Sequence, residues 1–179
     1  MIGVLVSGEG TNLQALIDAG LPIVAVASNK AGTRALEREE LAGIETAVFE
    51  VEKYPDREAR DAAMAKWFGA RGAEWVVCAG YMHLLRRSFL ERFPGRVINT
   101  HAAPLPAFPG PHPIDDVLAA GVPETAATVH YVDGGIDTGP VIAAEAVPVL
   151  RGDDADTLQA RVQAAEHRLL PRVVRGLIA

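Results

Sequence analysis

Short apolar runs separated by helix-like segments constrain the fold of this chain more than any other feature. Residues 2–6 form one such run, others follow at 23–27 and 75–79, and a further expected strand at 97–101 begins as one. Continuous apolar strands are typical of parallel sheets, because helices cover both faces of such sheets. The segments between the runs have the apolar spacing and the turn residues of helices. This alternation predicts an α/β fold with a parallel sheet.

The last part of the chain departs from this alternation. Strands are expected at 125–132 and 141–149 with no helix between them, which indicates antiparallel pairing added to the parallel sheet. A further short strand is expected at 46–49, and helices at 13–19, 33–42, 57–70, 88–93, 113–120 and from Asp156 or Thr157 onward. We predict a single doubly wound, mostly parallel sheet of about seven strands with an antiparallel C-terminal strand, helices on both faces, and one domain over residues 1–179.

Local signals add detail to two of these helices. Asp56 and Ser88 are expected to be the N-caps of the helices that follow them. The apolar face of helix 57–70 is expected to consist of Ala59, Ala62, Ala63, Trp67 and Phe68.

Composition excludes several classes of partner. The formal net charge is −6 and no block of basic residues occurs, so nucleic acid is not expected as a partner. No apolar run reaches the ~18 residues that a membrane span needs. The single cysteine, Cys78, cannot form an intramolecular disulfide, and we expect a cytoplasmic protein. The five histidines lack metal-ligand spacing, so we expect no metal. Separately, we expect small-molecule substrates and a monomer or weak homodimer.

The stretch 97–110 carries the first candidate site. Asn99 and His101 are two residues apart on an expected strand, so their side chains point to the same face. The loop that follows contains three prolines and a glycine and is therefore stiff. Asp133 and Asp137, in a glycine-rich loop after another strand, offer a carboxylate. We expect an amide, an imidazole and a carboxylate to meet at the carboxyl ends of the strands.

The first turn of the chain is a second candidate. Residues 7–12, Ser-Gly-Glu-Gly-Thr-Asn, join a strand to a helix, and such turns offer backbone N–H groups to an anion. The turn lacks both the Gly-Lys-Ser/Thr of a P-loop and the third glycine of a dinucleotide fingerprint. The alternative is a tight turn in which Thr11 or Asn12 caps the helix.

Four motifs, taken in order, resemble the folate-dependent phosphoribosylglycinamide formyltransferases of purine biosynthesis. They are residues 6–14, residues 80–85, Asn99-Thr100-His101 and residues 133–140, and a fifth stretch at 161–167 resembles the C-terminal substrate segment of that family. The resemblance covers essentially the whole chain. It implies the formyltransferase fold, with 10-formyltetrahydrofolate as co-substrate and the amine of glycinamide ribonucleotide as acceptor.

The resemblance also implies a role for each site residue. Asn99 and His101 would stabilise the tetrahedral oxyanion, while Asp137 would raise the His101 pKa and assist proton transfer. Glycinamide ribonucleotide would be bound by Gly10, Thr11, Asn12, Gln163 and Glu166. The folate would be bound by Arg57, Met82, His83, Leu84, Leu85, Asn99, Asp133, Gly134, Gly135 and Ile136, with Arg57 near its glutamate tail.

The chain departs from the family pattern at two places. Ala102-Ala103 stands where proline and serine usually follow the histidine, and His83 stands where an arginine is common. Two other functions are considered, a formyltetrahydrofolate hydrolase and a sugar-phosphate binding module that has lost catalysis. The hydrolase would share Asn99, His101 and Asp137, whereas the intact trio argues against the binding module.

Overall fold

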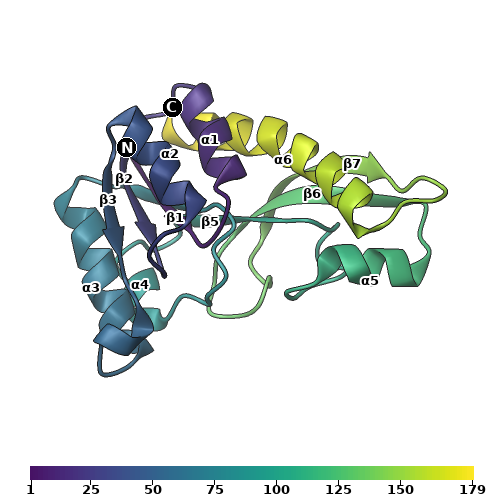
Figure 1. The fold of residues 1–179 in the computed structure, drawn as a ribbon. Helices are drawn as coiled ribbons and strands as arrows, with labels where there is room; N and C mark the ends of the chain where they lie inside the picture. The colour runs from purple at the N-terminus through teal and green to yellow at the C-terminus, as the bar shows by residue number, and fades with distance from the viewer.

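A seven-stranded sheet with helices on both faces forms the structure (Figure 1). The computed structural model describes residues 1–179, apart from the side chains of residues 39–42. The strands are β1 (Ile2–Val6), β2 (Ile23–Ser28), β3 (Glu45–Val48), β4 (Trp75–Cys78), β5 (Val97–His101), β6 (Glu124–Tyr131) and β7 (Val141–Pro148). The helices are α1 (Thr11–Asp18), α2 (Arg34–Ala42), α3 (Arg57–Ala70), α4 (Arg87–Leu90), α5 (Pro113–Ala120) and α6 (Ala155–Ile178), with a 3-10 turn η1 (Val51–Lys53).

The strand order is β3-β2-β1-β4-β5-β6-β7, and the strands from β3 to β5 in this order are parallel. Strand β6 runs antiparallel to β7, as expected from the missing helix between 132 and 141, and it also runs antiparallel to β5. The chain moves outward from β1 to β2 and β3, and then returns to place β4 on the other side of β1. The connections that leave the carboxyl ends of the neighbouring strands β1 and β4 therefore run in opposite directions, toward β2 and toward β5. Such a point is where open α/β sheets bind ligands. The predicted fold class is confirmed.

Two apolar layers cover the sheet. One contains Leu16 of α1 and Leu169 of α6 against the strands, and the other contains Phe68 of α3 and Phe89 of α4. Figure 1 shows α1 and α6 on one side of the sheet and α3 and α4 on the other. Within the described part of the chain, no helix combines the length and the apolar character needed to cross a lipid bilayer.

Three predictions about helix ends were wrong, namely the N-cap of α4, the last residue of α4 and the first residue of α6. Helix α4 has Arg86 as its N-cap and ends at Leu90, while the Ser88 hydroxyl donates instead to the backbone carbonyl of Glu58. Helix α6 begins at Ala155, because Asp154 accepts from the Thr157 N–H in a capping box.

The buried face of α3 also differs from the expected one. It contains Arg60 and Asp61 together with Met64, Ala65 and Phe68, whereas Ala62 is exposed and Ala59, Ala63 and Trp67 are half-buried. A charged pair has turned inward because the two side chains bind each other. The predicted cap of this helix is confirmed, since Asp56 accepts from the Ala59 N–H at 2.8 Å.

Candidate active site

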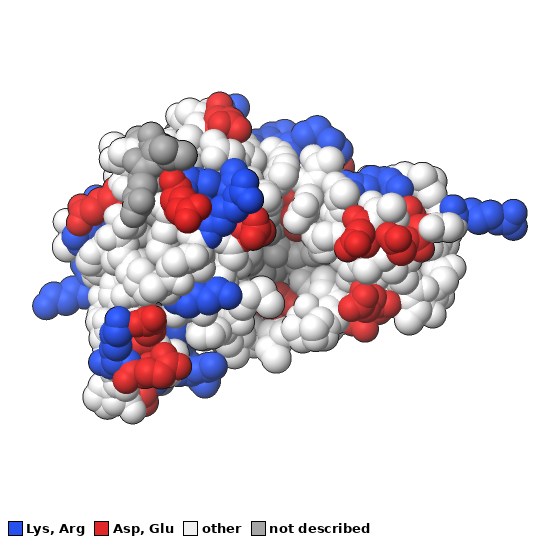
Figure 2. Space-filling view, in the orientation of Figure 1, with Lys and Arg blue, Asp and Glu red and all other residues white. Residues whose placement is uncertain are grey.

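A cavity of about 490 Å³ opens at the carboxyl ends of β4 and β5. The segment 80–85 after β4 and the end of β5 form one wall, and the loop 132–139 after β6 forms another. Asn12 of α1 and Gln159 and Glu166 of α6 close the remaining side. In Figure 2 the molecule is hollowed near the middle of the face shown, and basic and acidic side chains are interspersed over that face. The volume is suited to a ligand of drug-like or cofactor size.

Asn99 is held by a histidine on the neighbouring strand. Asn99 and His130 are paired in the register of β5 and β6, and the Asn99 amide donates to His130 Nε2 at 3.2 Å. His130 Nδ1–H donates to the Tyr131 carbonyl at 2.8 Å. Burial lowers the pKa of His130, and the Tyr131 carbonyl and Asp137 oppose this shift only in part. His130 is therefore neutral at pH 7, and its free ring nitrogen fixes one hydrogen of the Asn99 amide.

Asp137 lies between two imidazoles. Its Oδ2 is 3.5 Å from Nδ1 of His101, and its Oδ1 is 3.6 Å from Nε2 of His130. The same Oδ2 accepts from the Gly110 N–H at 2.9 Å, so the carboxylate also ties the loop after β6 to the loop after β5. The structure thus brings Asn99, His101 and Asp137 together and adds His130, which the sequence did not suggest.

Two residues next to His101 have backbone conformations that side chains other than glycine rarely adopt. Phe108 has φ 54° and Asp137 has φ 53°. The Phe108 carbonyl accepts from His101 Nε2 at 2.7 Å, and Asp137 faces the other ring nitrogen. Aspartate tolerates this region, whereas a bulky phenylalanine there costs roughly 1–3 kcal/mol. Strain of this kind accumulates at functional sites, and here the strained Phe108 holds one ring nitrogen of His101.

The turn before α1 has a glycine cap. Gly10 is the N-cap with φ 72°, and α1, whose side chains are all described, has no side-chain cap. The alternative with Thr11 or Asn12 as the cap is therefore wrong. A Cβ atom on Gly10 would lie 2.7 Å from the Ala35 Cα, so the turn packs directly against α2. The first N–H groups of α1 remain for a ligand anion.

Asn12 points to α6 instead of capping α1. Its amide donates to Glu166 Oε2 at 3.1 Å, and both side chains are buried at the edge of the cavity. Burial raises the pKa of Glu166, and the bond from Asn12 opposes this only in part. Thr11 faces a separate hollow that Arg38 and His167 also line.

The chain is similar to known proteins over nearly its whole length. Residues 1–174 match the family model described as formyl transferase. The chain belongs to the formyl transferase family. The resemblance predicted from its motifs is confirmed.

The relatives of this formyl transferase include a protein named for one activity and a protein named as trifunctional. Phosphoribosylglycinamide formyltransferase of Mycobacterium tuberculosis is 44% identical over 97% of this chain and 83% of that protein. The trifunctional purine biosynthetic protein adenosine-3 of Drosophila pseudoobscura pseudoobscura is 44% identical over 97% of this chain, which spans 13% of that protein. The crystal structure of glycinamide ribonucleotide transformylase 1 from Symbiobacterium toebii has a TM-score of 0.95 at 43% identity, covering 97% of this chain and 85% of that one.

The other residues predicted to bind substrates in this formyl transferase fall into two groups. Those that line the cavity are Met82, His83, Leu84, Leu85, Asp133, Gly135 and Ile136. Those that are not among its lining residues are Arg57, at the first position of α3, and Gly10, Gly134 and Gln163. Gln159, four residues before Gln163 on α6, lines the cavity instead and was missed. Gln163 was assigned only from the resemblance of residues 161–167 to the family, and the residues of α6 that face the cavity could not be chosen without the packing of that helix.

Asp133 shapes its own loop in this formyl transferase. Its Oδ1 accepts from the Gly135 N–H at 2.9 Å and from the Thr138 hydroxyl at 2.5 Å. These two bonds, with that of Thr138 first, lower the pKa of Asp133. Among the side chains that the structure describes, no group of three or more His, Cys, Asp or Glu is arranged to hold a metal ion.

Proposed function

We propose that this chain transfers the formyl group of 10-formyltetrahydrofolate to the amine of 5-phosphoribosylglycinamide in purine biosynthesis. Membership of the formyl transferase family supports the reaction class. The printed name of the relative from M. tuberculosis supports the acceptor. The observation that carries the proposal is the group of Asn99, His101 and Asp137 at the wall of one cavity.

The cavity fits a flat, partly apolar donor molecule. Met82 and Ile136 line it from two different loops, and they are 67% and 59% exposed. Large apolar side chains exposed at a cavity are typical of a ligand surface. The N-terminus of α1, with Asn12 at the cavity, offers N–H groups for the phosphate of the acceptor.

Asn99 is the hydrogen-bond donor that is already free to bond the formyl oxygen. When bound, the formyl donor supplies an electrophilic carbonyl carbon, and attack by the amine places negative charge on the formyl oxygen. Asn99 Nδ2 carries two hydrogens, so one remains for that oxygen after the bond to His130. His101 Nε2–H is already donated to Phe108 and would have to exchange that partner for the formyl oxygen.

Asp137 is positioned to accept the proton that the attacking amine loses and to return it to the leaving group. The attacking amine loses a proton and the leaving nitrogen of the folate gains one, so a group that accepts and returns a proton is needed. Asp137 is half-buried at the cavity and lies within 3.6 Å of two imidazoles. Its carboxylate can accept the proton directly or through one water molecule.

The release of tetrahydrofolate tests the proposal, because its absorbance differs from that of the formylated donor. We expect release only when glycinamide ribonucleotide is present, and an unchanged rate after treatment with EDTA. Release at the same rate without the acceptor would instead establish the hydrolase. Binding of the acceptor without any release of folate would establish the binding module.

A further inference from the structure

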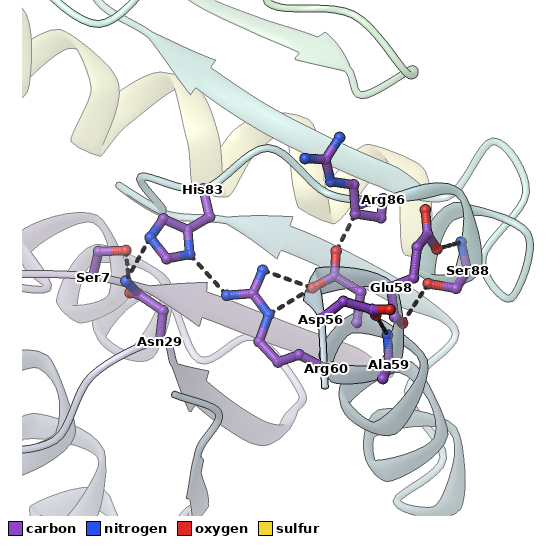
Figure 3. A network of polar contacts seen from close by, with 10 residues as sticks. Ser7, Asn29, Asp56, Glu58, Ala59, Arg60, His83, Arg86 and Ser88 are labelled. Atoms are coloured by element: carbon purple, nitrogen blue, oxygen red, sulfur yellow. Dashed lines mark hydrogen bonds and ion pairs between the residues drawn. The ribbon is translucent and has the colours of Figure 1, made fainter. Parts of the chain in front are cut away.

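A buried arginine contacts His83, the residue that departs from the family pattern. Arg60 on α3 has no exposed surface, and its Nη1 lies 2.7 Å from His83 Nδ1. Figure 3 shows Arg60, His83, Asn29 and Ser7 in one row of polar contacts between α3 and the end of β1. Arg60 itself does not line the cavity, whereas His83 does.

The charge of Arg60 is neutralised within the same network. Its Nε and Nη2 both lie 2.7 Å from Asp61 Oδ1, and Asp61 is equally buried. The other carboxylate oxygen, Oδ2, accepts from the Arg86 N–H at 2.7 Å. The ion pair therefore anchors the chain at Arg86, directly after the segment 82–85 that lines the cavity.

Arg60 determines which nitrogen of His83 carries the hydrogen. A guanidinium has only N–H donors, so Nδ1 must accept with its lone pair, and the hydrogen of the neutral ring is on Nε2. Burial lowers the pKa of His83, and Arg60 and Arg57 lower it further. The charged or titratable groups around this ring are Arg60, Arg57, Asp61, Glu52 and Tyr81, the last packed edge-on at 5.8 Å.

The Nε2–H tautomer sets the rest of the row. In the structure Asn29 Nδ2 lies 3.3 Å from His83 Nε2, and the Ser7 hydroxyl donates to Asn29 Oδ1 at 2.6 Å. Two N–H groups cannot bond each other, so the Nε2–H tautomer requires the oxygen and nitrogen of the Asn29 amide to exchange places, with the oxygen toward His83 and the nitrogen donating to Ser7. Ser7 Oγ also accepts from the Met82 N–H at 2.9 Å. The segment 82–85 is thus held at Met82 by one end of the row and at Arg86 by the other.

We infer that Arg60 and His83 are positioning residues that fix the shape of the 82–85 wall of the cavity through Asn29, Ser7 and Asp61. The row also connects this wall to Ser7, the first residue of the turn between β1 and α1. The identity of the ligand at the wall, the formyl donor, rests on the proposed function.

The tautomer can be tested without any ligand. Long-range ¹H–¹⁵N correlation of the histidine rings in the intact chain should show His83 neutral at pH 7, with a bare Nδ1 and a protonated Nε2. An Nδ1–H tautomer or an imidazolium at pH 7 would overturn the inference. This result does not depend on whether the chain transfers formyl groups.

The positioning role is tested by steady-state kinetics of two variants and their combination. Ser7 is not among the cavity-lining residues, so Ser7→Ala removes the anchor of Met82 without removing a ligand contact. We expect Ser7→Ala and His83→Leu each to raise the KM for the formyl donor about tenfold, since an ångström of misplacement costs up to ~10²-fold. The double variant should be no worse than His83→Leu alone, because both break the same row.

Two controls complete the test. His83→Gln can accept from Arg60 and donate to Asn29, so it should keep the donor KM within about threefold of the wild type. Ser88→Ala removes a hydroxyl from the same region but outside the row, and it should leave the donor KM unchanged. An unchanged donor KM in Ser7→Ala, or effects that simply add in the double variant, would overturn the inference. A wild-type chain that consumes no formyl donor would overturn the proposed function, and the NMR result would still decide the tautomer.

Discussion

Asn99 and His130 face each other across the antiparallel pair of β5 and β6, and the amide donates to the ring nitrogen at 3.2 Å. The bond requires a neutral histidine, because an imidazolium has no lone pair to accept it. Burial, which lowers the pKa of His130, supplies that condition. The orientation of the amide that faces the cavity thus depends on a group on another strand.

The first prediction concerns this pair. His130→Leu should lower kcat about tenfold, within the range for losing one partner of a buried hydrogen bond, ~1–3 kcal/mol. His130→Gln, which still offers an oxygen to Asn99, should lower kcat less. In the wild type, kcat should fall as the pH is lowered below the ordinary histidine pKa of ~6.5, because His130 then becomes protonated. Stopped assays across pH 5–8 measure both effects, and an acid limb unchanged in His130→Gln would assign it to another group.

The second prediction concerns Asp137. Asp137→Asn keeps an oxygen for the Gly110 N–H, and asparagine tolerates the φ of 53°, so the loop should keep its shape. The variant loses the charge and the proton acceptor, and kcat should fall by roughly 10²–10⁴. The KM values and the melting temperature should change little, since the lost interaction belongs to the transition state. Asp156→Asn, an exposed position at the start of α6, is the control. An unchanged kcat would reduce Asp137 to a loop residue.

The parts of the site predicted from sequence are those set by local geometry. Asn99 and His101 share a face because strand periodicity is two, which needs no knowledge of the fold. His130 was missed because its meeting with Asn99 depends on the register between β5 and β6. Arg60 was missed because an arginine in a helix is expected at the surface, and only Asp61 and His83 make its burial tolerable. Long-range pairing of polar groups is thus what the sequence leaves open.

The third prediction separates the roles of two glycines in the first turn. A Cβ on Gly10 would meet the backbone of Ala35, and its φ is 72°, so Gly10→Ala should lower the free energy of unfolding by about 1–3 kcal/mol. A Cβ on Gly8 meets no described atom within 4 Å, so Gly8→Ala should stay within about 0.5 kcal/mol of the wild type. Urea unfolding of both variants provides the comparison. Equal losses of unfolding free energy in the two variants would mean that the packing of Gly10 against α2 does not make that position more sensitive than Gly8.

The last prediction uses the pH dependence of stability at Glu166. Burial raises the pKa of Glu166 in the folded state. The protonated side chain therefore contributes fully to folding stability below the unfolded pKa of ~4.3, and this contribution is lost as pH rises through the raised folded pKa. A glutamine side chain cannot ionise, so Glu166→Gln should raise the melting temperature relative to the wild type by roughly 2–4 °C at pH 7.5, and by less at pH 4. The exposed Glu124→Gln is the control and should show no such difference between the two pH values. A gain that is equal at both pH values, or larger at pH 4, would mean that the bond from Asn12 outweighs burial and that Glu166 is a well-stabilised carboxylate at the edge of the cavity.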